Sequence, residues 1–233
     1  LCTNGHFCGT MRIGYFQYIL RILRIFNILH ILFGRTIMEL KNKTVLFLGD
    51  SITEGAGTTA PEFNYVSVFS RLSGANVVNY GIGGTRIARQ TVKSNERWDK
   101  DFVARVDEMQ KVADVVVVFG GTNDFGHGDA RIGTFESRDV YTFYGAMHVL
   151  CQKLIEKYPD AVIVFMTPLH RLSEDSMTKE FGVPEEKNLA GYVEIIKEVA
   201  GFYGLPVLDL FHTSGLQPKV DIIREKFMPD GLH

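Results

Sequence analysis

Short apolar runs alternate with longer amphipathic segments from Met38 to the end of the chain. The runs are continuous in Val, Ile, Leu and Phe, which is typical of parallel strands buried on both faces. Such strands alternating with helices predict an α/β fold built on a doubly wound parallel sheet of about five strands. The expected strands cover residues 45–48, 76–80, 114–119, 161–166 and 206–210, and the expected helices lie near 62–73, 95–111, 138–158 and 186–203.

Residues 38–233 are expected to form one domain, because no repeat, low-complexity tract or flexible linker interrupts them. Residues 1–37 differ: the chain opens on leucine, and residues 11–37 are rich in Ile, Leu and Phe with arginines but no Asp or Glu. We interpret residues 1–37 as a non-domain leader, upstream of a natural start at Met38. The alternative is a basic amphipathic helix over residues 11–35 that lies on a membrane.

The expected cellular location of the protein depends on which interpretation of residues 1–37 is correct. With Met38 as the start, no secretory signal remains and a cytoplasmic protein is expected. A genuine interfacial helix would make the protein membrane-associated, and secretion is the further alternative. A membrane span is not expected, because the longest stretch between arginines covers residues 25–34, well short of the roughly 20 residues that a bilayer requires.

The composition excludes several classes of function. It is 45% hydrophobic and 22% charged, as in a globular protein with a full core. A net charge of −2 gives no electrostatic basis for binding nucleic acid. The cysteines and histidines show no metal-ligand spacing, so no metal and no cofactor are expected. Cys151 is expected to be a small buried hydrophobe.

A serine follows the first predicted strand directly, in residues 49–53 (Gly-Asp-Ser-Ile-Thr). Ligands of parallel α/β sheets bind at the carboxyl ends of the strands, so Ser51 is a candidate nucleophile. A serine hydroxyl needs a base to take its proton. Residues 230–233 (Asp-Gly-Leu-His) offer His233 as that base and Asp230 to orient it. The alternative for Ser51 is capping of the next helix.

Glycine-rich turns follow the second and third predicted strands, at residues 81–84 (Gly-Ile-Gly-Gly) and 120–124 (Gly-Gly-Thr-Asn-Asp). Glycine permits tight turns and close approach of the backbone to a ligand. The first of these turns lacks the spacing and the first-strand position of a dinucleotide-binding fingerprint. Because three successive strands end in such turns at one edge of the sheet, we expect a site assembled from several loops.

With these motifs in order, the chain resembles the SGNH hydrolases, also called the GDSL esterase/lipase family. The resemblance rests on residues 49–53, 79–84, 121–124 and 230–233, and it covers essentially all of residues 38–233. It implies a flavodoxin-like, three-layer α/β/α fold with a shallow, open site. Family members usually continue past the last motif into a final helix, so the chain is expected to be a fragment cut at both ends.

The resemblance also implies roles for five residues. Ser51 would be the nucleophile, His233 the general base and Asp230 the group that fixes the imidazole. The backbone N–H groups of Ser51 and Gly84 and the side-chain amide of Asn123 would bind the oxyanion. The alternatives are turn geometry for Gly84 and hydrogen bonding to a loop backbone for Asn123.

Other polar residues near the predicted site have expected roles as well. Asp50 and Asp124 are expected to brace loops, and Asp209 is a rival triad acid for which a structural role is favoured. The remaining segment of note, residues 169–187, has no clear periodicity and is expected to form a wall of the substrate pocket. Among the histidines, the candidates for the pocket are His127 and His170, and those expected to be structural are His148 and His212.

The sequence therefore predicts a serine ester hydrolase that forms an acyl-enzyme on Ser51. The expected substrates are small or short-chain esters, including acetyl groups on carbohydrates. A lysophospholipase or thioesterase with the same triad is one alternative. A catalytically impaired module that binds an ester or a carbohydrate is another. The expected partner is a small-molecule ester, and the sequence leaves the oligomeric state open.

Overall fold

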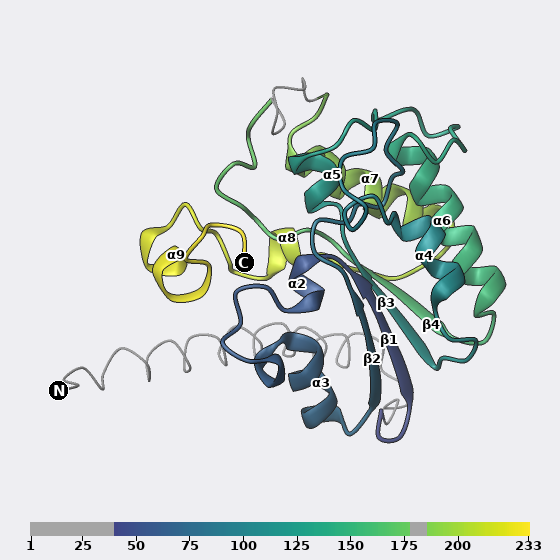
Figure 1. Cartoon of the computed structure of the whole chain (residues 1–233), viewed down its shortest axis with the longest axis vertical. Helices are drawn as coiled ribbons and strands as arrows, with labels where there is room; N and C mark the ends of the chain where they lie inside the picture. The colour runs from purple at the N-terminus through teal and green to yellow at the C-terminus, as the bar shows by residue number, and fades with distance from the viewer. Residues whose placement is uncertain (1–39, 178–185) are drawn as a thin grey trace.

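A five-stranded parallel sheet lies at the centre of the computed structural model (Figure 1). The structure describes residues 40–177 and 186–233, so the expected leader over residues 1–37 lies outside the described residues. The strand order is β2-β1-β3-β4-β5, which is the flavodoxin-like order and confirms the predicted fold. The strands are β1 (Thr44–Gly49), β2 (Asn76–Gly81), β3 (Val115–Phe119), β4 (Val162–Met166) and β5 (Val207–Leu208).

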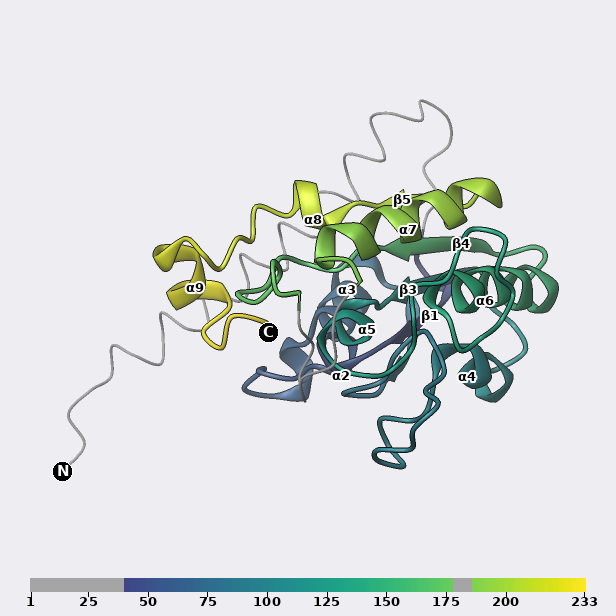
Figure 2. The same cartoon turned by 90° about the horizontal axis from the view of Figure 1, so that it is seen from above.

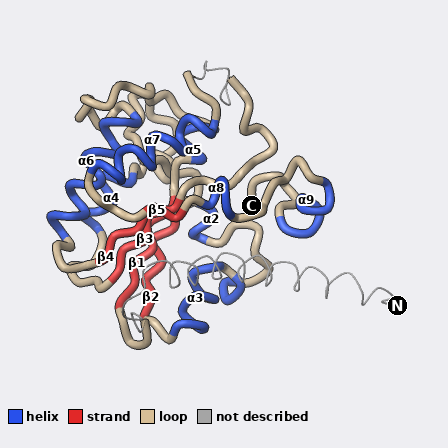
Figure 3. The backbone as a smooth tube through the Cα atoms, turned by 180° about the vertical axis from the view of Figure 1, so that it is seen from behind, coloured by secondary structure: helices blue, strands red, loops and turns tan. Residues whose placement is uncertain are grey.

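Helices cover both faces of the sheet and make the three layers (Figures 2 and 3). One face is covered by α4 (Phe102–Glu108), α5 (Thr122–Gly126), α6 (Phe143–Lys157) and α7 (Leu189–Phe202). The other face is covered by α3 (Tyr65–Ser73), and α9 (Asp221–Phe227) lies beyond the carboxyl edge of the sheet (Figures 1 and 3). The remaining short elements are α2 (Ser51–Glu54), η1 (Pro61–Phe63) and α8 (Leu210–Thr213).

The strand side chains divide between two hydrophobic clusters, one on each face. Successive residues of a strand point to opposite faces, so a continuous apolar run supplies both clusters at once. The cluster beneath α4, α6 and α7 takes the strand residues Leu46, Leu48, Val116, Val118, Ile163 and Phe165. The cluster beneath α3 takes the strand residues Val45, Phe47, Val115, Val117, Phe119, Met166 and Leu208. Cys151, predicted to be a small buried hydrophobe, is fully buried in the first cluster.

Capping side chains set where the longer helices begin. The side-chain oxygen of each capping residue accepts a hydrogen bond from a backbone N–H in the first turn, which satisfies a donor that the helix leaves open. The capping residues are Asn64 for α3, Asp101 for α4, Thr142 for α6 and Asn188 for α7.

The predicted helix over residues 95–111 is too long, because α4 begins only at Phe102. Residues before it form turns in which side chains bind the backbone. Asn95 Oδ1 accepts a hydrogen bond from the Arg97 N–H at 2.9 Å, and Asp99 Oδ2 accepts one from the Ser94 N–H at 3.0 Å. Such local side-chain bonds compete with helix formation, and they turn this segment toward the carboxyl edge of the sheet.

Within residues 40–177 and 186–233, no helix combines the length and the apolar character that crossing a bilayer requires.

Replacement of a central core side chain tests the packing of the sheet. Leu46 lies on β1 and is completely buried, so Leu46→Ala is expected to lower the free energy of unfolding by ~2–5 kcal/mol. Leu72 on α3 is 52% exposed, and Leu72→Ala is the control, expected to change stability by no more than ~0.5 kcal/mol. Urea denaturation of both variants measures the difference. Equal stabilities would contradict the assigned core.

Candidate active site

Ser51 lies immediately past the carboxyl end of β1 and begins α2. The preceding residue, Asp50, caps this short helix by accepting a hydrogen bond from the Ile52 N–H at 3.0 Å. Asp50 is therefore the residue that caps this helix. The sequence had left capping open as an alternative role for Ser51. The serine hydroxyl is left to bond elsewhere.

The Ser51 hydroxyl contacts a histidine 182 positions away in the sequence. Ser51 Oγ and His233 Nε2 are 2.8 Å apart, and Figure 1 shows the carboxyl terminus beside α2. The other ring nitrogen, His233 Nδ1, lies 2.7 Å from Asp230 Oδ2. The structure therefore brings together Ser51, His233 and Asp230 in one hydrogen-bonded series, with the imidazole in the middle.

Asp230 binds the histidine through its backbone as well as its ring. Its Oδ1 accepts hydrogen bonds from the N–H groups of Leu232 at 2.9 Å and His233 at 2.7 Å. Partial burial acts to raise the pKa of Asp230, but the hydrogen bonds from His233 and Leu232 outweigh it and hold the pKa below 3.8. The carboxylate is therefore ionised at neutral pH, as a partner of the imidazole must be.

A loop after β4 contacts the turn that carries these two residues. The Leu172 N–H donates to Gly231 O at 3.0 Å. A Cβ atom at Gly231 would lie 2.4 Å from the Leu172 side chain, and the φ of +75° also favours glycine there. The loop belongs to residues 169–187, which were expected to form a pocket wall, and residues 178–185 of that segment lie outside the described part of the chain.

The loop after β2 carries Gly84, which has a φ of +78°. The indole of Trp98 occupies the space next to it, since a Cβ atom at Gly84 would lie 2.2 Å from that ring. Asn123, at the start of α5, donates from Nδ2 to Thr85 O at 3.0 Å. An amide NH₂ carries two hydrogens, so this bond occupies one of them. The structure thus joins Asn123 to the residue directly after Gly84.

Arg105 of α4 connects the ends of the first two strands, and it was not identified from the sequence. Its Nη1 donates to Gly49 O at 3.1 Å and to Thr85 Oγ1 at 2.9 Å, and its Nη2 donates to Tyr80 O. The residue is only 3% exposed. Burial lowers the pKa of Arg105 to about 10, which leaves the guanidinium charged at neutral pH.

Two buried carboxylates lie under the same loops. Asp124 accepts hydrogen bonds from the N–H groups of Ile87 at 2.9 Å and Ala88 at 2.8 Å, which is the bracing role predicted for it. Burial raises the pKa of Asp50 to about 7, against the hydrogen bond from Ile52, and the charge of Asp124 adds to the rise.

The rival acid and the other histidines have partners of their own. Asp209 lies 2.9 Å from His212 Nδ1 and 3.1 Å from Lys197 Nζ. His127 is buried, with Nδ1 3.0 Å from Arg86 Nη1 and its ring against Trp98.

His148 and His170, one expected to be structural and one a pocket candidate, also have defined contacts. His148 is fully buried in α6, with Nδ1 3.1 Å from the Tyr203 hydroxyl. His170 Nδ1 lies 2.6 Å from Glu174 Oε2, and its ring lies against Phe211. In the described ranges, no group of three or more His, Cys, Asp or Glu is placed to hold a metal ion.

Comparison with known proteins identifies a family and similar structures. A family model described as the GDSL-like lipase/acylhydrolase family matches residues 47–233. No curated protein matches the chain. One solved structure is 35% identical, with a TM-score of 0.71 over 84% of this chain and 90% of the other.

Two further solved structures are similar to the chain. A protein from Lactobacillus plantarum is 25% identical, with a TM-score of 0.69 over 83% of this chain and 88% of its own. An acetyl xylan esterase is 21% identical, with a TM-score of 0.56 over 82% of this chain and 90% of its own. At this identity, the similarity to the acetyl xylan esterase shows a shared fold and no more.

A serine, a histidine and an aspartate hydrogen-bonded in series at the carboxyl edge of a parallel sheet form an arrangement typical of serine hydrolases. The match to a family model shows which family of serine hydrolases the chain belongs to. The chain belongs to the GDSL-like lipase/acylhydrolase family and is a carboxylic ester hydrolase.

Removal of the Arg105 guanidinium tests whether it holds the strand ends together. Arg105→Met keeps much of the buried volume but leaves Gly49 O, Tyr80 O and Thr85 Oγ1 without this donor. The free energy of unfolding is expected to fall by ~2–4 kcal/mol, since unpaired buried polar groups are costly. Denaturant titration measures it, and Arg138→Met on the exposed 133–139 loop is the control. A change for Arg105→Met no larger than that of the control would contradict the assignment.

The raised pKa of Asp50 predicts a pH-dependent stability. In the unfolded chain Asp50 ionises near 3.8, whereas the folded protein keeps the proton until about pH 7. The contribution of Asp50 to stability is therefore complete below the unfolded value and is lost as the pH rises through the folded one. Asp50→Asn keeps a capping oxygen but has no charge to bury. Its melting temperature relative to the parent protein is expected to rise between about pH 4 and pH 8. A difference that does not vary with pH would refute this.

Proposed function

We propose that the protein hydrolyses small or short-chain esters, acetyl groups on carbohydrates among them, through an acyl-enzyme on Ser51. The observation that carries the proposal is the 2.8 Å contact between Ser51 Oγ and His233 Nε2, together with the 2.7 Å contact between His233 Nδ1 and Asp230. A base within hydrogen-bonding distance of a serine hydroxyl, itself oriented by a carboxylate, is what nucleophilic catalysis by serine requires.

Attack on the ester begins with transfer of the hydroxyl proton to His233 Nε2, while Ser51 Oγ bonds to the carbonyl carbon. Asp230 accepts the hydrogen on Nδ1, which fixes the tautomer that leaves Nε2 free to act as the base. The imidazolium then gives its proton to the oxygen of the leaving alcohol as the tetrahedral intermediate collapses. Water, deprotonated by the same imidazole, hydrolyses the acyl-serine and restores the hydroxyl.

The oxyanion of the intermediate requires fixed donors. In this proposal they are the backbone N–H groups of Ser51 and Gly84 and the second hydrogen of Asn123 Nδ2. The bond from Asn123 to Thr85 O, 3.0 Å long, supports this assignment because it fixes the amide beside Gly84. Loss of one such donor typically costs ~3–4 kcal/mol of transition-state stabilisation.

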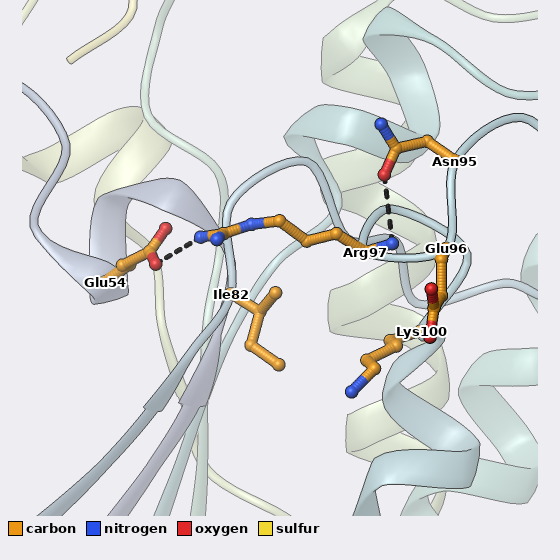
Figure 4. Close-up of a pocket in the computed structure, with 6 residues that line it drawn as sticks. All are labelled: Glu54, Ile82, Asn95, Glu96, Arg97 and Lys100. Atoms are coloured by element: carbon orange, nitrogen blue, oxygen red, sulfur yellow. Dashed lines mark hydrogen bonds and ion pairs between the residues drawn. The ribbon is translucent and has the colours of Figure 1, made fainter.

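The preference for short acyl groups is supported by the polar lining of the cleft next to α2 (Figure 4). Long acyl chains bind in pockets lined mostly by apolar side chains. The cleft next to α2 instead carries charged groups, Glu54, Glu96, Arg97 and Lys100. The similarity in fold to an acetyl xylan esterase is consistent with this substrate class.

Replacement of the nucleophile tests the proposal. Ser51→Ala is expected to lower kcat for p-nitrophenyl acetate by at least a factor of ~1,000, because the covalent route is lost. Ser67→Ala on α3, a serine away from the site, is the control and is expected to retain full activity. Unchanged hydrolysis by Ser51→Ala would refute the assignment.

Two further measurements separate the alternatives. A fluorophosphonate probe is expected to label Ser51 covalently, and binding of an ester without such labelling would instead support a non-catalytic module. A series of p-nitrophenyl esters is expected to show activity falling from acetate to longer chains. A rise with chain length would favour the lysophospholipase or thioesterase alternative.

A further inference from the structure

Residues 170–174, here called the β4 loop, fold back on themselves after β4. The backbone turns through a hydrogen bond from the Glu174 N–H to Arg171 O at 3.2 Å. The Glu174 carboxylate closes the turn, because its Oε2 lies 2.6 Å from His170 Nδ1 and accepts from the Arg171 N–H at 3.3 Å. Glu174 is only 6% exposed, so its carboxylate is a buried part of the loop.

The tip of the β4 loop contacts the turn formed by residues 230–233. The Leu172 N–H donates to Gly231 O at 3.0 Å, and the Leu172 side chain fills the space beside the glycine. Gly231 follows Asp230 directly and lies two residues before His233. The β4 loop therefore touches the 230–233 turn between its acid and its base.

The Glu174 carboxylate also binds the segment that leads into α9. Its Oε1 lies 2.7 Å from Lys219 Nζ and accepts from Gln217 Nε2 at 3.2 Å. Lys219 lies two residues before α9, and the 230–233 turn follows that helix. An ion pair with a buried carboxylate is screened by salt less than a surface pair. One oxygen of Glu174 thus holds the β4 loop, and the other holds the segment before α9.

Arg171 attaches the β4 loop to the opposite part of the site. Its Nη1 donates to Thr122 O at 3.2 Å, and its guanidinium lies 5.6 Å from the centre of the Phe125 ring. Both contacts are on α5, the helix that carries Asn123. The β4 loop is therefore held against α5 on one side and against the 230–233 turn on the other.

We propose that Glu174 is a positioning residue, which holds the β4 loop and the segment before α9 so that His233 reaches Ser51. The inference rests on the proposed function, which makes His233 the base. Asp230 and His233 contact each other within one turn, at 2.7 Å, so loss of the Glu174 carboxylate moves them together. The distance that changes is the one between His233 Nε2 and Ser51 Oγ.

Displacement of the base slows both halves of the reaction. His233 acts in the attack by Ser51 and again in the attack by water, so kcat falls while KM stays near that of the parent protein. A misplacement of about 1 Å can cost about 100-fold in rate. A purely structural role of Glu174 would instead reduce the amount of folded protein and leave the rate of each folded molecule unchanged.

Hydrolysis of p-nitrophenyl acetate by the full chain separates these two roles. The measured quantity is kcat divided by the number of serines that a fluorophosphonate probe labels at completion, which counts reactive sites. Glu174→Gln is expected to lower this kcat per labelled site by about tenfold, and Lys219→Met by about threefold. Lys219→Arg keeps the ion pair and is expected to retain the parent rate.

Asp175→Asn is the matched control. Asp175 also pairs with Lys219, at 2.5 Å, but its side chain is 75% exposed, and the variant is expected to keep the kcat and KM of the parent protein. Kcat per labelled site that neither Glu174→Gln nor Lys219→Met lowers would overturn the role of Glu174 alone. An equal fall for Asp175→Asn and Glu174→Gln would overturn it as well. Turnover by Ser51→Ala at the parent rate would overturn the proposed function, and the role of Glu174 with it.

Discussion

The position of β1 is the constraint on which the site depends. This strand pairs with β2 on one side and β3 on the other, and its side chains from Val45 to Leu48 are buried on both faces of the sheet. A strand held in this way cannot shift its register without exposing a core side chain. Its carboxyl end is therefore fixed. This also fixes the position of Ser51, which lies two residues beyond that end. The loops that follow β2 and β3 emerge on either side.

Buried polar groups hold these loops relative to one another. Buried backbone carbonyls at strand ends require hydrogen-bond donors. Arg105 binds two of them together with a hydroxyl of the loop after β2, and Asp124 binds two N–H groups further along that loop. A preorganised site is expected to cost little reorganisation during reaction. The site loops are thus held by Arg105, which lies outside the motifs, and by Asp124, which lies within one.

Much of the fold could be predicted because its signals are local. Continuous apolar runs located all five strands, and glycine-containing turns located the edge where the site lies. The prediction of a helix over residues 95–111 was wrong in its first part, because the side chains of Asn95 and Asp99 bind nearby backbone groups. Hydrophobic periodicity carries no information about such bonds. The error matters, since that segment provides Trp98 beside Gly84 and one wall of the cleft.

The fold class and the family could be read from the order of residues alone. So could the candidate site residues Ser51, Asp230, His233, Gly84 and Asn123. These follow from hydrophobic pattern and motif order, which are properties of neighbouring residues. Only the tertiary structure brought Ser51 to within 2.8 Å of a histidine 182 positions away, buried Arg105 between two strand ends, and opposed the charges of Glu54 and Arg97 across a cleft. Contacts of this kind depend on how the sheet and its covering helices pack, and no local pattern in the chain encodes them.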